Sequence, residues 1–214
     1  MYGPKLRIEY DEFGITLVPP KVEWAGYYAE MMSSLKVNMW TNGLYGLTEA
    51  DEREWLEKSA KDPKGVSWAI MPDGCKLPVG NTGLHDISLV NGSCTSGIVI
   101  FDPEWWGKGV ASGAHIIRTG FGADNLGRST INSTVREVNE ASRKALERVG
   151  YAVTGKVLRN CFRDGEYYDT LTLTWLHPER INLLYPQGLP PEYTGAVERA
   201  SQVLKKARDL VKKL

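Results

Sequence analysis

The sequence IVIFDPEWWGKGVAS, residues Ile98–Ser112, is the most informative stretch of this chain for its fold and its chemistry. A strand-like apolar run leads into Asp102-Pro103, then into Gly107 and Gly109, and then into a helical pattern. This order gathers unpaired main-chain N–H groups at a helix N-terminus, where the helix dipole favours an anion. Glycine lets the main chain approach a phosphate without a Cβ in the way. The stretch predicts a phosphate-type anion site, with a plain strand-to-helix turn as the alternative.

Two common nucleotide-binding motifs are absent. The P-loop pattern G-x-x-x-x-G-K-[ST] does not occur. The dinucleotide fingerprint G-x-G-x-x-G fails at Ser112, and no acidic residue ends a second strand. The anion site is therefore predicted to be of another kind.

Upstream of this stretch, alternation predicts strands and three- to four-residue apolar spacing predicts helices. The expected strands are a hairpin over 5–18 and an antiparallel series over 66–71, 79–89 and 94–101. The expected helices cover 22–35 and a segment that starts at Thr48, with a loop over 37–46 between them. In the second helix the Thr48 hydroxyl is expected to cap Asp51, with Trp55 and Leu56 facing the core.

Downstream, helices are expected over 110–122 and 140–149, and strands over 129–135, 151–158 and 167–176. This order predicts an α/β fold, with a mixed central sheet of about seven strands and flanking helices. The sheet is expected to be antiparallel early and parallel where helices cross over. Residues 1–178 are predicted to form this domain.

Composition changes after His177-Pro178. Three prolines interrupt residues 179–192, and apolar residues at three- and four-residue steps then predict a C-terminal amphipathic helix. Residues 179–214 are thus expected to be a Pro-interrupted linker and this helix. Residues 191–214 carry six basic and three acidic side chains. Docking on its own domain, a homodimer contact and a basic face for an acidic partner all remain open.

Composition excludes several classes of protein. The chain has 214 residues, 42% of them hydrophobic, which fits one globular domain. With 26 basic and 26 acidic residues the formal net charge is zero, so no overall electrostatic field attracts a polyanion. Neither a nucleic acid nor a membrane is therefore expected as a partner. No long apolar or signal-type run occurs, and the protein is expected to be cytoplasmic. Cys75, Cys94, Cys161 and the histidines lack metal-ligand or disulfide spacing, so no metal is expected.

The loop residues Trp106-Gly107-Lys108-Gly109-Val110-Ala111 resemble the acetyl-CoA pyrophosphate loop [RQ]-x-x-G-x-[GA] of the GCN5-related N-acetyltransferases (GNAT superfamily), with Trp106 replacing Arg or Gln. The string DPEWWGKGVAS is similar to the P-x-x-W-G-x-G-x-A of the RimJ/RimL-like ribosomal-protein N-terminal acetyltransferases. Asn139-x-x-Ser142 before Gly150-Tyr151, the hairpin near 158–169 and segments 37–40 and 48–56 extend the resemblance. It covers about residues 5–177, and the tail after His177 has no counterpart in it.

The resemblance implies acetyl-CoA as cosubstrate and gives roles to particular residues. Main-chain groups of Val99 and Phe101 would pair with the pantetheine arm, and Asn139 would bond to it. The pyrophosphate would be held by the main-chain amides of Gly107, Lys108, Gly109, Val110, Ala111 and Ser112. Ser142 would lie near the thioester sulphur. From the residues alone, Asn139 is also a good helix N-cap and Ser142 an ordinary first-turn polar residue.

The resemblance implies transfer of an acetyl group from acetyl-CoA to a primary amine. Ser96 and Thr154 stand where relatives often carry a glutamate base, so the candidates for the catalytic base are His85, Asp86 and Asp169. Without a strong base, the expected acceptor is an α-amino group of a protein N-terminus or an amino-acid-like small molecule. The alternative is a non-catalytic acyl-CoA-binding or sensor module.

Overall fold

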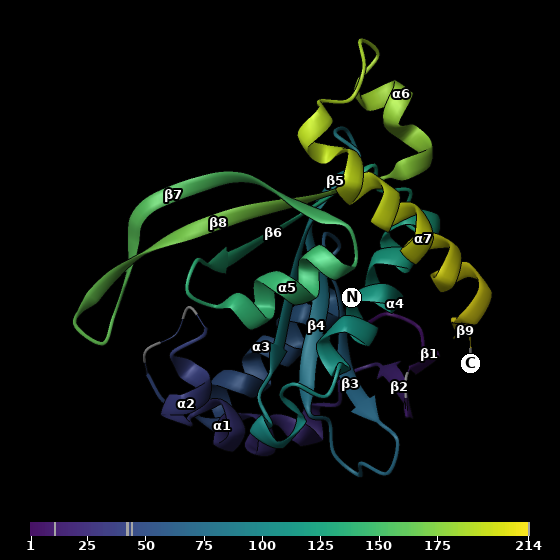
Figure 1. Ribbon diagram of the computed structural model, residues 1–214. Coiled ribbons are helices and arrows are strands. Elements are labelled where there is room, and N and C mark those ends of the chain that lie inside the picture. The colour runs from purple at the N-terminus through teal and green to yellow at the C-terminus, as the bar shows by residue number, and fades with distance from the viewer. Residues whose placement is uncertain (11, 42, 44, 214) are drawn as a thin grey trace.

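The computed structural model describes residues 1–213 apart from residues 11, 42 and 44. Its described residues form one mixed sheet in the order β7-β8-β6-β5-β4-β3-β2-β1-β9. Helices α4, α5 and α7 lie together on one side of the sheet, and the paired strands β7 and β8 extend from it as a long curved arm (Figure 1). The predicted α/β architecture is confirmed.

The strands follow the expected segments closely. Their bounds are β1 Leu6–Tyr10, β2 Phe13–Val18, β3 Val66–Pro72, β4 Gly80–Ser88, β5 Ser93–Ile100, β6 Thr130–Arg136, β7 Tyr151–Arg163, β8 Glu166–Leu176 and β9 Lys212–Lys213. Neighbours from β1 to β5 are antiparallel, β5 and β6 are parallel, and β8 is antiparallel to both β6 and β7. The expected sheet has about seven strands. The described part of the chain contributes nine, because both hairpin strands and the two-residue β9 join the sheet.

The helices are α1 Ala25–Met32, α2 Leu35–Asn38, α3 Glu49–Lys61, α4 Val110–Asp124, α5 Glu140–Arg148, α6 Ile181–Leu184 and α7 Thr194–Leu210. The expected helix over 22–35 is divided into a 3-10 turn (Val22–Trp24), α1 and the start of α2. The expected loop over 37–46 therefore begins inside a helical turn, and its positions 42 and 44 lie outside the described residues. None of the described helices is long and apolar enough to cross a membrane.

The start of α3 is fixed by a reciprocal cap. The Asp51 N–H donates to Thr48 Oγ1 (3.2 Å), and the Thr48 N–H donates to Asp51 Oδ2 (2.8 Å). Leu56 is fully buried, as expected. Trp55 is 41% exposed, so the expectation that it faces the core is wrong.

Replacing Thr48 with alanine should lower the free energy of unfolding by about 1 kcal/mol, since the Asp51 N–H loses its acceptor. In a domain of this size, thermal denaturation should show a fall in Tm of about 2–4 °C. Thr194→Ala is the matched control. Thr194 is exposed at the start of α7, and the N-cap residue of that helix makes no side-chain hydrogen bond. Equal melting temperatures for the two variants would contradict a stabilising cap.

The core has two parts, one on each face of the sheet. The larger lies between the sheet and helices α4, α5 and α7, and includes Trp68 and Trp175. The smaller contains Tyr28, Leu56 and Phe101 and lies against α1 and α3. Helices thus pack on both faces of the sheet. A functional site is therefore expected between strands rather than on a face of the sheet.

The C-terminal helix is confirmed as α7 and lies across α4 (Figure 1). Ala200, Leu204 and Ala207 are buried in the main core, so its apolar stripe is used within the chain. Arg208 pairs with Asp124 of α4 (2.9 Å) and with Glu179. Docking on its own domain is therefore what the structure shows, while a homodimer contact and a domain boundary at 178 stay predictions. Leu214, the last expected stripe residue, lies outside the described residues.

Candidate active site

The site arises where two parallel strands separate. β5 and β6 pair only from Ser93 to Thr95 against Thr130 to Asn132. Beyond this point a cleft of about 1580 Å³ opens, lined by the rest of both strands and by the first turns of α4 and α5. The open edges of two strands thus face each other across a space large enough for an extended ligand.

The predicted anion site lies at one end of this cleft. Gly107 and Gly109 adopt φ values of 77° and 82°, a left-handed conformation that favours glycine, and Gly109 is the N-cap of α4. The first-turn N–H groups of Val110, Ala111 and Ser112 have no acceptor within the helix. All five residues line the cleft. The strand-to-helix turn is confirmed, and the anion site at the same residues stays a prediction.

Lys108, between the two glycines, does not line the cleft. Its Nζ lies 5.2 Å from the centre of the Trp105 ring instead. Only the main chain of this residue is placed to serve the predicted site.

Trp106 stands where the acetyl-CoA loop pattern has Arg or Gln. Its indole Nε1 donates to the Ile100 carbonyl (2.7 Å), and Lys36 Nζ lies 5.3 Å from the ring centre. The indole therefore ties the glycine loop to the end of β5 by a neutral hydrogen bond. Trp106 itself lines the cleft.

Asn139 and Ser142 both line the cleft at the start of α5. The Ser142 N–H donates to Asn139 Oδ1 (3.1 Å), so Asn139 is the N-cap of this helix. One lone pair of its oxygen is used by the cap, and its Nδ2 donor is available to a ligand. The roles of Asn139 and Ser142 toward a cosubstrate stay predictions.

Val99 lines the cleft, although its carbonyl points toward Gly80 of β4, and Phe101 does not line it. Phe101 is fully buried in the smaller core, and its N–H donates to the Val79 carbonyl (3.0 Å). The expected pairing of Phe101 main-chain groups with pantetheine conflicts with this placement for the N–H, because that donor is already used within the fold.

On β5, the Ile98 main-chain N–H faces the cleft. The Gly97 carbonyl accepts from Thr82 Oγ1 (2.9 Å) of β4, on the side away from β6. A trans peptide points its C=O and N–H in opposite directions, and no described peptide bond is cis. The Ile98 N–H therefore points toward the gap between β5 and β6. The Ser96 carbonyl also faces β6, since it accepts from Ser133 Oγ (3.2 Å).

His85 lies beside this peptide. A Cβ built on Gly97 would lie 3.0 Å from His85 Cε1, so the imidazole rests against the β5 main chain inside the cleft. His85 is exposed to the open cleft, but partial desolvation lowers the pKa of its imidazole below the usual 6.5, and the nearby Asp86 carboxylate partly opposes this. The neutral, proton-accepting form is thus favoured near pH 7.

Asp86 and Asp169 lie outside the cleft. Asp86 is exposed, with a φ of 51° at the β4 bulge, and acts on the cleft only through its field on His85. Asp169 accepts from the Arg159 N–H (2.9 Å) and pairs with Lys156 (3.2 Å), contacts that lower the pKa of its carboxyl. Of the three candidate bases, His85 lines the same cleft as the glycine loop, whereas the carboxylates of Asp86 and Asp169 do not.

The two positions of the absent glutamates also differ. Ser96 is buried in the cleft wall, with its Oγ 3.2 Å from Tyr151 Oη. Thr154 is exposed on β7, 2.9 Å from Thr174 Oγ1, and does not line the cleft. A base at position 154 would have no direct access to the cleft.

Comparison with known proteins identifies this architecture. The model of the acetyltransferase (GNAT) domain matches residues 15–152, more than half of the chain. The chain belongs to the GNAT acetyltransferase family. The acetyl-CoA-dependent acetyltransferase expected from the sequence is thereby confirmed at the level of the family, whose members act on amines.

Individual GNAT relatives are more distant. The chain is 28% identical over 118 residues to the N-acetyltransferase YoaA of Bacillus subtilis (strain 168), described as uncharacterized, and the match spans 55% of this chain and 66% of that relative. The structure of Mycobacterium smegmatis RimJ with CoA-disulfide superposes with a TM-score of 0.70 at 18% identity, covering 98% of this chain and 95% of that one. Spermidine N-acetyltransferase from Vibrio cholerae, with CoA and spermine, gives 0.69 at 19% identity, covering 76% and 95%.

The RimJ comparison corrects one expectation. A match to 98% of this chain includes most of the segment after His177, so the tail does have a structural counterpart. At 18% identity this likeness concerns the fold alone.

The residues of the GNAT cleft fit the cosubstrate of the family. Free N–H groups at the start of α4, the left-handed glycines and the Ile98 N–H are the donors that a pyrophosphate and an extended amide-containing arm require. Among the described residues, no cluster of three or more His, Cys, Asp or Glu is placed to hold a metal ion.

The opposite mouth of the GNAT cleft has aromatic walls. Trp40 and Trp55 line it and are 38% and 41% exposed. Arg136 of β6 donates to the carbonyls of Met39 (2.6 Å) and Thr41, which holds this segment over the cleft. Sequence reasoning missed these contacts, because they join residues more than ninety positions apart in the chain.

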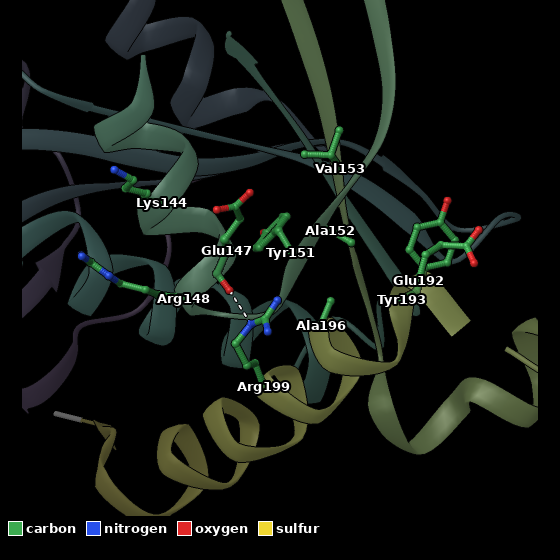
Figure 2. A pocket seen from close by; sticks show the side chains of 10 residues that line it. All are labelled: Lys144, Glu147, Arg148, Tyr151, Ala152, Val153, Glu192, Tyr193, Ala196 and Arg199. Carbon is green, nitrogen blue, oxygen red and sulfur yellow. Dashed lines mark hydrogen bonds between the residues drawn. The ribbon is translucent and has the colours of Figure 1, made fainter. Parts of the chain in front are cut away.

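A second hollow lies outside the GNAT cleft, between the end of α5, the start of β7 and α7. Figure 2 shows Arg199 reaching from α7 to the Glu147 carbonyl (3.0 Å) across it. It contains none of the predicted site residues. The second hollow therefore carries none of the predicted chemistry.

Proposed function

We propose that this protein transfers the acetyl group of acetyl-CoA to an α-amino group, on a protein N-terminus or an amino-acid-like small molecule. The observation that carries the proposal is the cleft, which is lined by a helix start with unpaired N–H groups, by β5 with its inward-facing Ile98 N–H and by the His85 imidazole. Acetyl-CoA, when bound, supplies the thioester that the amine attacks.

The proposed roles account for each bond and proton. A bond forms between the amine nitrogen and the acetyl carbon, and the carbon–sulphur bond breaks. His85 accepts the proton that the amine loses. The Ile98 N–H stabilises the negative charge that develops on the acetyl oxygen. The sulphur leaves with the bonding electrons as the CoA thiolate, to which the Ser142 hydroxyl donates a hydrogen bond.

The pKa of His85 selects among amines. At pH 7 about 14% of an α-amino group with a pKa near 7.8 is neutral, against about 0.04% of a lysine amine with a pKa near 10.4. A base whose pKa lies below 6.5 cannot readily take a proton from a lysine ammonium ion. The acceptor is therefore an amine that is already partly neutral.

Membership of the RimJ/RimL-like branch is part of this proposal. It is supported by the P-x-x-W-G-x-G-x-A string, whose Trp106 makes the loop tether, and by Asn139-x-x-Ser142 at the start of α5. The overall fold does not separate the branches, because RimJ and the spermidine enzyme superpose almost equally well.

A panel of acceptors tests the choice of amine. At pH 7, a peptide with a free N-terminus and no lysine should have a kcat/KM at least about tenfold above that of a lysine peptide with a blocked N-terminus, or of spermidine. Thiol release from acetyl-CoA is the measurement. Rapid acetylation of the blocked lysine peptide that is lost in His85→Ala would overturn the proposal.

A non-catalytic acyl-CoA-binding or sensor module is the second candidate function. It is favoured by Ser96, which occupies the place of a common glutamate base and is engaged with Tyr151. Tight binding of acetyl-CoA without thiol release across the whole amine panel would select this function over transfer.

A further inference from the structure

Arg118 of α4 is a buried charge without a buried countercharge. The side chain is 0% exposed, and no carboxylate of the described residues lies within salt-bridge distance of it. A guanidinium held only by neutral groups is expensive to bury, and an apolar side chain of similar size would cost less. Stability alone therefore does not account for an arginine here.

Its hydrogen bonds converge on the cleft wall. Nη1 donates to Thr82 Oγ1 (2.8 Å) and to the Gly97 carbonyl (2.9 Å), and Nη2 contacts His115 Nδ1 (2.7 Å). The guanidinium thus lies behind β5, on the carbonyl side of the peptide between Gly97 and Ile98.

His115 holds the guanidinium in a fixed orientation. Arginine has only donors, so His115 Nδ1 must accept and the ring proton must sit on Nε2. Burial and the charge of Arg118 keep the pKa of His115 well below its usual value. His115 therefore stays neutral and does not oppose the charge beside it.

The charge acts on the peptide whose N–H faces the cleft. A charged donor on the Gly97 carbonyl draws electron density toward that oxygen, which makes the N–H of the same peptide a stronger donor. We infer that Arg118 is a positioning residue for acetyl transfer, which orients and polarises the Gly97–Ile98 peptide toward the acetyl oxygen. This inference rests on the proposed function of the cleft.

The test compares Arg118→Met with wild type in kinetics and in the infrared. The expected result is a fall in kcat of about tenfold or more, with a KM for acetyl-CoA within about threefold of wild type. The carbonyl stretch of bound [1-¹³C]acetyl-CoA, recorded without amine, should lie below that of the free thioester in wild type and move back toward it in the variant. Arg118→Lys keeps the charge and should recover part of both effects.

Arg128→Met is the matched control. Arg128 is also buried and donates to main-chain carbonyls of Leu126 (2.8 Å) and Ser88 (2.5 Å), but it does not line the cleft. Its loss should lower Tm while leaving the carbonyl stretch unchanged. This control therefore separates a loss of stability, which both variants share, from a change at the cleft.

Two outcomes would overturn the inference. One is a folded Arg118→Met protein with wild-type kcat and carbonyl stretch. The other needs no variant, and is a bound carbonyl stretch in wild type equal to that of free acetyl-CoA. Failure of the proposed function gives a different result. Wild type would then release no thiol, while the infrared comparison would still report on the Gly97–Ile98 peptide.

Discussion

Replacing Gly109 with aspartate should abolish the binding of acetyl-CoA. Gly109 has a φ of 82° and is the N-cap of α4. An aspartate there would accept hydrogen bonds from the first-turn N–H groups, which are the donors a pyrophosphate needs, and would repel its charge. It would also carry the strain of a left-handed non-glycine residue, about 1–2 kcal/mol. Titration calorimetry should show no heat of binding.

Two further variants separate strain from charge. Gly74→Asp is the matched control, since Gly74 has a φ of 81°, has open space around it and lies outside the cleft. It should bind acetyl-CoA as wild type does. Gly109→Ala imposes the strain without the carboxylate and should weaken binding only in part. Retention of wild-type affinity by Gly109→Asp would show that this helix start does not hold the cosubstrate.

Replacing His85 with glutamine should lower kcat/KM by about 10²-fold or more, the contribution of a general base. Binding of acetyl-CoA should be unchanged, because the His85 imidazole lies against Gly97 and not against the loop at Gly107. An unchanged kcat/KM in His85→Gln would remove this residue from the mechanism.

The pH dependence gives a second readout. Because the cleft lowers the pKa of His85, its neutral form persists to below pH 6.5, and activity should be lost only as pH falls through that lowered pKa. The Asp86 carboxylate raises this pKa, so Asp86→Asn should move the acid limb to lower pH, and His85→Gln should eliminate it. The same amine is used throughout, since its own ionisation also enters kcat/KM.

His177→Gln is the control for these profiles. His177 also has a pKa lowered by burial, but it caps a 3-10 turn outside the cleft by accepting from the Glu179 N–H (3.3 Å). Its loss should affect stability and leave the acid limb in place. Movement of the limb in this variant would assign it to global unfolding rather than to catalysis.

The sequence by itself determined the features that depend on neighbouring residues. The left-handed turn at Gly107 and Gly109, the Thr48–Asp51 cap and the Asn139 cap each join groups within a few positions, where φ preference and short hydrogen bonds act directly. The order of strands and helices followed from hydrophobic periodicity in the same way. These local rules were enough to predict the fold and the strand-to-helix turn, while the anion site at that turn stays a prediction.

Only the tertiary structure decided which groups face the cleft. Side chains alternate along β4, and the placement of the strand in the sheet decides that His85 lines the cleft while Asp86 next to it does not. Pairing of Phe101 with Val79 removes a donor that the motif had offered, and leaves the Ile98 N–H toward the cleft. Arg118 reaches Gly97 from another element, 21 positions away. Such contacts depend on strand register and helix docking, which no short stretch of sequence specifies.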